Sequence, residues 1–428
     1  MESFYDAVVI GGGPAGSTVA TFLARAGRRV LVVEKERFPR FHVGESLLPY
    51  SLPIFERLGV LEKIRAAGYQ KKFGAFFWND VTGEGTRPVV FEDAFNDQHP
   101  MAYQVKRADF DLLLLQHSEA SGAEVRQETA VEQVLFEGPR AVGVRVAAKD
   151  GRFEEIYARA VVDASGQSAF LSQKLGTRKF DSRLKRAALF AHYEGIRWPE
   201  ESRPGDILLP IAEGVWYWII PFSDGTASVG AVFEPSLAKE SGAQDLEARF
   251  EWFLARLPRM PLLLAGATRT SKVFSISDYS ATSGKMAGDG YVLVGDAATF
   301  LDPVFSTGVF LALATGERAA KAVDQALTKH GRLDAKDLAR YEKDAKKLFA
   351  RFRRFVYGFY DPVFFEAFCT PNPPEPMRKA VTTILAGGVE NPTFALRLWT
   401  QLMLWGVGLD RVVRRLTGRT PKPADAPG

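Results

Sequence analysis

The chain has 428 residues, 46% apolar and 25% charged, and at about 150 residues per domain this length predicts two or three domains. Its 55 basic and 51 acidic residues give a net charge of only +4, so composition does not indicate a nucleic-acid binder. The single cysteine, Cys369, excludes an internal disulfide and any multi-cysteine metal site, and the five histidines are scattered, so we expect no metal site.

The N-terminus has no basic stretch followed by an apolar core, so the sequence predicts no signal peptide. No uncharged apolar run reaches the ~18 residues that a membrane span needs. The best candidate, residues 398–409, contains Thr400 and Gln401 and predicts an amphipathic or buried helix. We therefore expect a cytoplasmic protein without a membrane span.

The beginning of the chain has the pattern of a strand, a glycine turn, a helix and a second strand. Residues 6–10 are apolar and β-branched, residues 11–16 are rich in glycine, residues 17–26 have helical composition, and residues 30–33 form the next strand. Such a βαβ unit predicts a parallel sheet.

Further along, strands and helices alternate before the chain becomes helical and basic after about residue 335. In chain order the expected elements are a helix at 108–121, a strand at 141–146, an antiparallel β region at 187–232 with strands at 216–221 and 227–233, a strand at 291–294 and a helix at 308–327.

Together these elements predict a mixed α/β and α+β fold. A Rossmann-like domain is interrupted by an antiparallel β-sheet substrate domain, and a helical C-terminal region follows. We assign residues 1–75, 101–180 and 276–335 to the Rossmann-like domain, 76–100 and 181–275 to the β domain, 336–418 to the helical region and 419–428 to a disordered tail.

The glycine turn matches G-x-G-x-x-G with Gly11, Gly13 and Gly16. These glycines permit a tight turn and a close approach of the backbone to a pyrophosphate at the helix N-terminus. Glu34 ends the second strand, where a carboxylate can accept hydrogen bonds from ribose hydroxyls. The pattern predicts a dinucleotide site, but NAD and FAD share it.

Three later segments distinguish the two cofactors. They are Arg107 in Lys106-Arg107-Ala108-Asp109, Asp163-Ala164-Ser165-Gly166, and Gly295-Asp296 after an apolar strand. With the glycine turn they resemble the FAD-binding superfamily of aromatic hydroxylases, geranylgeranyl reductases and flavin-dependent halogenases. The resemblance implies an FAD-binding domain of the aromatic hydroxylase type, with the arginine facing the cofactor phosphates and the aspartate facing the ribityl chain.

Four features resemble the flavin-dependent halogenases in particular. They are the loop at 38–49, which those enzymes place beside the isoalloxazine, W-x-W-x-I-P at 216–221, F-x-x-P-x-x-S-x-G at 300–308, and Lys72, at the position of the lysine on which their catalysis depends. The resemblance extends to about residue 330. The glycine pattern and the resemblance together assign the following residues to the cofactor: Gly11, Gly13, Pro14, Ala15, Gly16, Glu34, Lys35, Arg40, Ser46, Arg107, Asp163, Gly295, Asp296, Pro303 and Gly308.

Each halogenase feature also has an ordinary structural interpretation. Trp216 and Trp218 alternate along a strand and so share one face, which indicates either core packing or a wall between substrate and flavin. Ser306 can cap the helix that follows, while the amides of Thr307 and Gly308 at its N-terminus favour a chloride or bromide ion. These last two interpretations are compatible.

Lys72 is the predicted catalytic lysine. The predicted catalytic set also includes Trp216, Trp218 and Ser306. Most lysines are solvated. If the segment is one strand, Lys72, Gly74, Phe76 and Trp78 share one face. Lys71, the alternative catalytic lysine, then points to the opposite side. A buried ammonium could hold hypohalous acid by hydrogen bonding, and a neutral amine could form a haloamine. Both routes remain open.

One position departs from the tryptophan halogenases, which carry a glutamate immediately before Ser-Thr-Gly where this chain has Phe305. The resemblance is therefore better to the phenol/pyrrole branch, whose members often act on substrates tethered to an acyl-carrier protein. Basic residues interleaved with phenylalanines at 346–355 predict either a solvated amphipathic helix or a docking surface for an acidic carrier protein.

The resemblance implies an FADH2-dependent halogenase that forms a flavin C4a-hydroperoxide and hypohalous acid and passes chlorine or bromine through Lys72 to a phenol or pyrrole. A separate NAD(P)H-dependent flavin reductase would supply FADH2, because the chain has one glycine fingerprint. The alternatives are an FAD-dependent monooxygenase or reductase of the same superfamily, and a degenerate flavoprotein that only binds carrier proteins.

Overall fold

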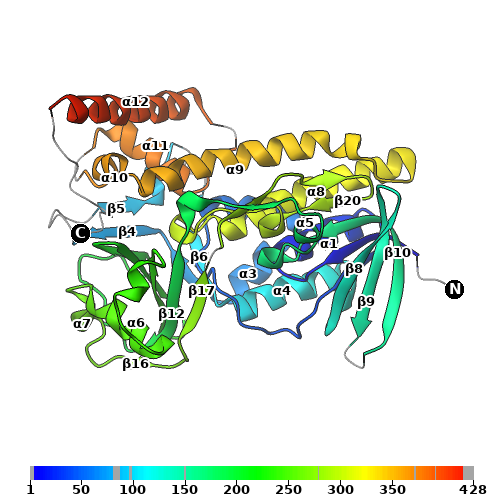
Figure 1. Cartoon of the computed structure of the whole chain (residues 1–428), viewed down its shortest axis with the longest axis horizontal. Helices are drawn as coiled ribbons and strands as arrows, with labels where there is room; N and C mark the ends of the chain where they lie inside the picture. The colour runs from blue at the N-terminus through cyan, green and yellow to red at the C-terminus, as the bar shows by residue number, and fades with distance from the viewer. Residues whose placement is uncertain are drawn as a thin grey trace.

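The computed structural model describes residues 4–80, 87–95, 99–148, 151–277, 279–370, 373–390 and 392–417. Two large sheets lie side by side, and the last four helices form a layer along one edge of the molecule (Figure 1). The predicted tail at 419–428 lies outside the described residues.

The first sheet contains the predicted parallel unit. Its order is β19-β20-β10-β1-β2-β7, with β8 and β9 extending from β10. The bounds of its strands are β1 (Phe4–Ile10), β2 (Val30–Val33), β7 (Glu124–Arg126), β8 (Thr129–Glu137), β9 (Arg140–Ala148), β10 (Phe153–Asp163), β19 (Ala287–Gly288) and β20 (Tyr291–Leu293). β1 is parallel to both β10 and β2, so three distant segments meet at one carboxyl edge.

Helices cover this sheet, and α1 packs against both α8 and α4. The helices of this part are α1 (Pro14–Arg25), α2 (Leu52–Leu58), α3 (Leu61–Ala66), α4 (Arg107–Ala120), α5 (Phe170–Lys174) and α8 (Gly308–His330). α1 begins with proline at its first position, where the missing N–H costs nothing.

The second sheet is mostly antiparallel, in the order β16-β12-β15-β14-β13-β4-β5, with β17 also paired to β12. Its elements are β4 (Gly74–Asn79), β5 (Arg87–Val90), β12 (Ala187–Glu194), β13 (Ile207–Ala212), β14 (Val215–Pro221), β15 (Thr226–Phe233), β16 (Thr268–Arg269), β17 (Phe274–Ser277), and the covering helices α6 (Leu246–Ala255) and α7 (Met260–Leu263). β4 pairs with β13 in parallel, so a segment from before residue 80 completes this sheet.

Side chains of β14 alternate between two cores, as its period of two requires. Trp216 and Trp218 pack into the core shared with the first sheet, while Tyr217 and Ile219 pack beneath α6 and α7. The strand is therefore the wall between the two cores.

Short strands and turns of 3-10 helix complete the connections. They are β3 (Gln70–Lys72) paired with β6 (Ala102–Gln104), β11 (Arg178–Phe180), β18 (Ala281–Ser283) and β21 (Thr299–Phe300) in a small sheet, and η1 (Pro49–Ser51), η2 (Phe91–Asp93), η3 (Gly166–Ser168), η4 (Ser182–Leu184), η5 (Leu237–Lys239), η6 (Gly295–Ala297), η7 (Pro303–Phe305) and η8 (Ala335–Leu338).

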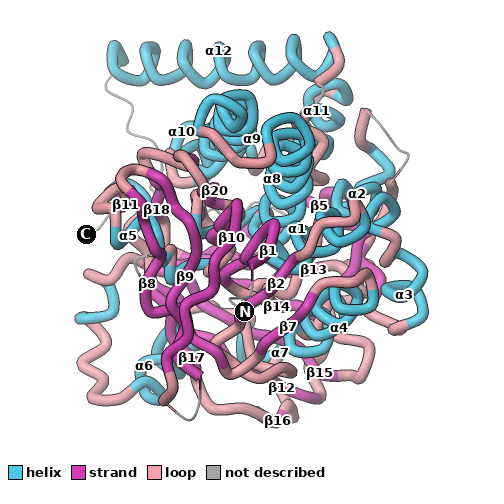
Figure 2. The backbone as a smooth tube through the Cα atoms, turned by 90° about the vertical axis from the view of Figure 1, so that its right-hand side faces the viewer, coloured by secondary structure: helices cyan, strands magenta, loops and turns pink. Residues whose placement is uncertain are grey.

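Four helices follow the last strands of the first sheet and α8: α9 (Ala339–Phe359), α10 (Pro362–Phe368), α11 (Glu375–Leu385) and α12 (Phe394–Thr417). α12 lies outermost in both Figure 1 and Figure 2. It is amphipathic, as the sequence predicts for 398–409, and it buries Leu396, Met403 and Val407. No helix among the described residues is long and apolar enough to cross a membrane.

The predicted elements are confirmed, with ends shifted by a few residues. Two local expectations were wrong. β3 and β4 are separate strands interrupted at Phe73, so Lys72 does not share one continuous strand with Gly74 and Trp78. Thr307, rather than Ser306, is the N-cap residue of α8, and Ser306 instead ends η7 with a left-handed φ of 55°.

Candidate active site

A cavity of 480 Å³ lies where the carboxyl edge of the first sheet meets the inner face of the second. It is lined by most of the residues that the sequence assigns to the cofactor and to catalysis: Gly11, Gly13, Pro14, Ala15, Glu34, Lys35, Arg40, Ser46, Arg107, Trp216, Trp218, Asp296, Pro303, Ser306 and Gly308. Gly16, Lys72, Asp163, Gly295 and Thr307 lie outside its lining.

The glycine turn leaves no room for side chains where it bends. A Cβ on Gly16 would lie 1.9 Å from the carbonyl oxygen of Gly11, and Gly11 itself has a φ of +100°. Below the turn, Glu34 accepts hydrogen bonds from the backbone N–H groups of Gly12 (2.7 Å) and Glu36 (2.8 Å). The first turn of α1 carries no acidic residue, so its unpaired amides present a positive end to the cavity.

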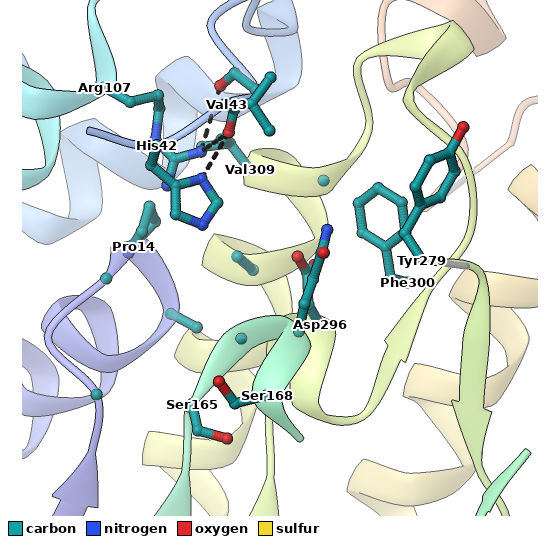
Figure 3. A pocket seen from close by; sticks show the side chains of 18 of the residues that line it. Pro14, His42, Val43, Arg107, Ser165, Ser168, Tyr279, Asp296, Phe300 and Val309 are labelled. Carbon is teal, nitrogen blue, oxygen red and sulfur yellow. Dashed lines mark hydrogen bonds between the residues drawn. The ribbon is translucent and has the colours of Figure 1, made fainter. Parts of the chain in front are cut away.

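Arg107 lies at one end of the cavity and is held there by a buried carboxylate. Its guanidinium donates to both oxygens of Asp111, at 2.7 and 2.8 Å, and to the carbonyl of Val43 (Figure 3). Arg40 donates to Asp111 as well, at 2.9 Å. Burial and these arginines lower the pKa of His42 to about 4, so its imidazole is neutral at pH 7. Arg40 also pairs with Glu36, at 3.3 Å, so this end of the cavity holds two arginines and two carboxylates. The two guanidinium groups are the kind of donor that suits phosphate groups.

Asp296 lines the opposite part of the cavity (Figure 3). Its carboxylate makes no hydrogen bond or ion pair within the described part of the chain, and burial raises its pKa to about 7. A half-buried carboxylate of this kind suits a ligand hydroxyl. Asp163, in contrast, is fully buried and accepts hydrogen bonds from the amides of Ser165 and Leu171, so it shapes the loop behind the cavity.

The shape and chemistry of this cavity fit an FAD. The glycine turn permits close approach to a pyrophosphate, Glu34 lines the cavity where a ribose would lie, and Arg107 supplies positive charge. The volume is within the range of small-molecule sites.

Trp216 and Trp218 stand side by side in the cavity wall, with ring centres 6.1 Å apart. A Cβ on Gly230, the cross-strand partner of Trp218, would lie 2.2 Å from its indole, so the ring lies flat on that glycine. The indole N–H groups donate to the hydroxyls of Tyr360 and Ser228. Both rings are therefore fixed in position.

Lys72 is only 2% exposed, whereas Lys71 is exposed, as the alternation along a strand predicts. Its Nζ donates to Ser46 Oγ at 2.9 Å and to the carbonyl of Leu47 at 3.1 Å, and it lies 5.3 Å from the centre of the Phe91 ring. Burial lowers its pKa to about 7, with Asp206 acting in the opposite direction. Because Ser46 also lines the cavity, one side chain separates the lysine from the cofactor site.

We expect stability to report the pKa of Lys72. Between pH 7 and 10.5 the unfolded lysine binds a proton that the folded one does not, so the free energy of unfolding should rise with pH across this window. Relative to Lys72→Met, the native protein should gain roughly 2 kcal/mol between pH 7 and 9, at ~1.4 kcal/mol per pH unit. Urea unfolding of both proteins at the two pH values measures this; parallel curves would contradict it.

The turn before α8 brings Ser306 into the cavity lining, and Gly308 begins the helix beside it. The N-cap residue Thr307 makes no side-chain capping bond, and the first turn contains no acidic residue. The first amides of a helix have no intrahelical acceptor, so this end can hold an anion.

The basic residues at 346–355 form one face of α9. Three of them are engaged within the chain: Lys346 pairs with Glu342, Arg351 donates to backbone carbonyls near α12, and Arg353 donates to Thr282. The interleaved phenylalanines Phe349, Phe352 and Phe355 are buried. Of the two interpretations of residues 346–355, this arrangement matches the amphipathic helix.

Sequence reasoning did not single out two further residues that line the cavity, Glu45 and Tyr279. Glu45 is buried and accepts from His192 Nε2 at 2.9 Å, and its other oxygen has no partner among the described residues. Glu45 precedes Ser46 in the loop at 38–49, which could have pointed to it. Tyr279 lies beside Phe300 (Figure 3), and no sequence motif marks it.

Comparison with known proteins identifies the family of the chain. The family described as "FAD binding domain" matches residues 5–355. A tryptophan 2-halogenase of Chondromyces crocatus is 34% identical over 84% of this chain and 69% of its own length. A 1H-pyrrole-2-carbonyl-[peptidyl-carrier protein] chlorinase of Pseudomonas fluorescens is 33% identical over 83% of each chain. The crystal structure of the myxobacterial chondrochloren halogenase CndH superimposes with a TM-score of 0.79 at 34% identity, covering 94% of this chain and 97% of that one.

Proposed function

Since this chain belongs to the flavin-dependent halogenases, enzymes of the FAD-binding family, we propose that it installs chlorine or bromine on a phenol or pyrrole ring. The observation that carries this proposal is the buried amine of Lys72, hydrogen-bonded to Ser46 at the edge of the cavity. Burying an amine costs free energy, and ionisable groups with pKa values perturbed by burial concentrate at functional sites.

FAD would bind across the carboxyl edge of the first sheet. The turn at Gly11 and Gly13 and the N-terminus of α1 would hold the pyrophosphate, Glu34 the ribose, Arg107 the phosphates and Asp296 the ribityl hydroxyls. Reduced FAD, when bound, supplies the electrons with which dioxygen and halide yield hypohalous acid. A separate flavin reductase would deliver it.

The halide would bind at the start of α8, near the amides of Thr307 and Gly308, because the first amides of a helix have no intrahelical acceptor. Ser306 lines the cavity next to this site. Its left-handed backbone conformation turns the chain from η7 into α8. Either chloride or bromide suits such a site.

Lys72 would then direct the halogen. In its neutral form the amine has two N–H groups, which Ser46 Oγ and the Leu47 carbonyl accept, and its lone pair remains. A pKa of about 7 populates this form at neutral pH. The lone pair can take the halogen of hypohalous acid while the O–halogen bond breaks, and the departing hydroxide leaves as water with one proton of the amine. Alternatively, the ammonium form can hold the acid by hydrogen bonding. The ring then attacks the halogen, the N–halogen or O–halogen bond breaks, and the ring loses its proton, which restores the amine or yields water.

Phe305 favours an electron-rich ring as the acceptor. It lies within 6.4 Å of Phe359 and Phe368, measured between ring centres, and so places a buried apolar cluster where tryptophan halogenases carry a glutamate. Phenols and pyrroles need less assistance toward electrophilic attack than the benzo ring of tryptophan's indole. The relative that acts on a carrier-bound pyrrole supports a substrate tethered to a carrier protein, with the free ring as the alternative.

The decisive experiment supplies reduced FAD, dioxygen and either halide together with phenol, pyrrole and indole acceptors, free and carrier-bound. We expect halogenated products by mass spectrometry that depend on halide. Hydroxylated products formed without halide would identify a monooxygenase, and flavin binding without any product would identify a binding module; either would overturn the proposal.

The tryptophan wall gives a second test. Gly230→Ala should displace the Trp218 ring, because the added Cβ would lie 2.2 Å from it, and should therefore behave like Trp218→Ala. Both variants should form less halogenated product per reduced flavin and release more hypohalous acid, measured with a diffusible scavenger. Gly284→Ala, where the new Cβ meets only an ordinary contact at 3.5 Å, is the control. Unchanged release of hypohalous acid from both Gly230→Ala and Trp218→Ala would contradict the role of Trp218 as a barrier.

A further inference from the structure

The outermost helix, α12, presents a continuous apolar stripe to solvent. Its side chains recur at steps of three or four residues, so they share one face of the helix along a length of about 36 Å. They are Phe394, Leu398, Leu402, Trp405, Leu409, Val412, Val413 and Leu416, and the exposed fractions of Phe394, Trp405, Leu409 and Leu416 are 80%, 66%, 67% and 82%.

This stripe is distinct from the face on which the helix is packed. Leu396, Met403 and Val407 are buried, and α12 contacts α10 and α11. An apolar stripe of this length on the solvent side costs solubility and indicates an interaction surface.

The charges on α12 point to an acidic partner. The helix contains four arginines and one carboxylate, Asp410, which Arg414 already binds at 2.8 Å. Arg411 pairs with Asp361, whereas Arg397 and Arg415, near the two ends of the stripe, form no ion pair within the described residues. The apolar stripe is thus bordered by exposed cations that are available to pair with an acidic partner.

We propose that α12 is the docking surface for the carrier protein, an acidic protein that presents the aromatic substrate on its flexible thioester arm. This inference rests on the proposed function and assigns the partner to a surface. Apolar contacts along the stripe supply affinity, and Arg397 and Arg415 align the acidic partner.

A continuous set of contacts joins this surface to Lys72. α12 packs on α11, and α11 packs on η2. Phe95, just after η2, donates its amide to Thr383 of α11, and Phe91 of η2 faces Lys72 Nζ. β5, which leads into η2, lies beneath α10 and α11 in Figure 1. A carrier protein on α12 would therefore sit on helices whose contacts lead through η2 to the lysine.

A second copy of this chain fits the stripe less well. If two α12 helices paired in antiparallel fashion, Arg397 of one copy would face the end of the other that carries Arg414 and Arg415. Asp410 is the sole carboxylate on either helix, and Arg414 of its own chain already binds it. Like charges facing each other oppose such a pair.

The test compares wild type with Trp405→Ser/Leu409→Ser and with Arg415→Glu, all at exposed positions. With carrier-bound acceptor we expect kcat/KM to fall roughly 10-fold or more, as for residues central to an interface, and with the free acceptor to stay within about 2-fold. Leu262→Ser, an equally exposed leucine on α7, and Lys347→Glu on α9 are the matched controls and should change neither rate.

Each other outcome overturns the docking surface. Equal kcat/KM of wild type and the α12 variants on the carrier-bound acceptor would contradict the proposal. A loss of kcat/KM confined to Lys347→Glu would contradict it as well. Sedimentation with phosphatidylcholine–phosphatidylserine vesicles that depends on Trp405 would instead assign α12 to a membrane, and a dimer in analytical ultracentrifugation that the double variant dissociates would assign it to a second copy. Failure of wild type to halogenate either acceptor would refute the proposed function itself.

Discussion

Lys72→Met should lower halogenation by about 10²–10⁴-fold while leaving FAD bound, the range expected when a positioned catalytic group is removed. Methionine has a similar length and no amine, so it removes the acceptor for the halogen and keeps the volume. The substitution leaves Ser46 Oγ and the Leu47 carbonyl without the donor that Lys72 provides. It also removes an ammonium that is unfavourable in this buried position, where burial lowers the pKa of Lys72 to about 7. The fold should therefore tolerate the change.

The matched control is Lys71→Met, the same substitution on the exposed neighbour, which should keep full activity. Product is measured by mass spectrometry with a scavenger present, so that freely diffusing hypohalous acid does not halogenate the acceptor. Bound FAD is measured by absorbance. Activity retained in Lys72→Met and lost in Lys71→Met would move the catalytic role to the neighbouring lysine.

Gly16→Ala should abolish stable FAD binding, with at least roughly 100-fold weaker affinity. The added Cβ would lie 1.9 Å from the carbonyl oxygen of Gly11 and 3.2 Å from Val9, so the turn must open where the backbone approaches the pyrophosphate. Overpacking of this kind costs about 1–3 kcal/mol or more, so the thermal midpoint should fall as well.

Gly13→Ala separates the two effects. Its Cβ would meet only the end of the Arg40 side chain, at 3.6 Å, and its φ of −69° suits any residue. We therefore expect unchanged stability without FAD but weaker binding, because the methyl group projects toward the cofactor cavity that Gly13 lines. Flavin titration and thermal unfolding of both variants check this. Wild-type affinity in Gly16→Ala would contradict the assignment of the pyrophosphate to this turn.

The sequence predicted the fold well where its signals are local. The glycine turn, the alternation of β14 and the apolar period of α8 each depend on neighbouring residues, and their elements appear within a few residues of the expected bounds. The break between β3 and β4 was missed, because it depends on Asp206, which accepts the amide of Phe73 from more than a hundred residues away. Local propensity holds no information about such a contact.

The candidate site shows the same division. Residues in motifs, such as Arg107 and Ser306, were predicted to lie at the site, and they line the cavity. Their partners were not predicted: the bond from Lys72 to Ser46, the pair of Glu45 with His192, and the support of Trp218 by Gly230 all join separate segments. The exposed stripe of α12 also required the structure, because the sequence shows an amphipathic helix without showing which of its apolar faces is covered.

The order of strands in the first sheet has a consequence for synthesis on the ribosome. β10 pairs with β9 at its start and with β1 further on, but its last residues, 161–163, gain their second neighbour, β20, only after residue 293 has been made. Until then, the edge of β10 that will pair with β20 is open, and Gly295, Asp296 and the start of α8 do not yet exist. A nascent chain that ends before this point has an incomplete flavin cradle, and its unpaired strand edge is a target for chaperones. Cofactor capture should therefore be a late event, close to release of the chain.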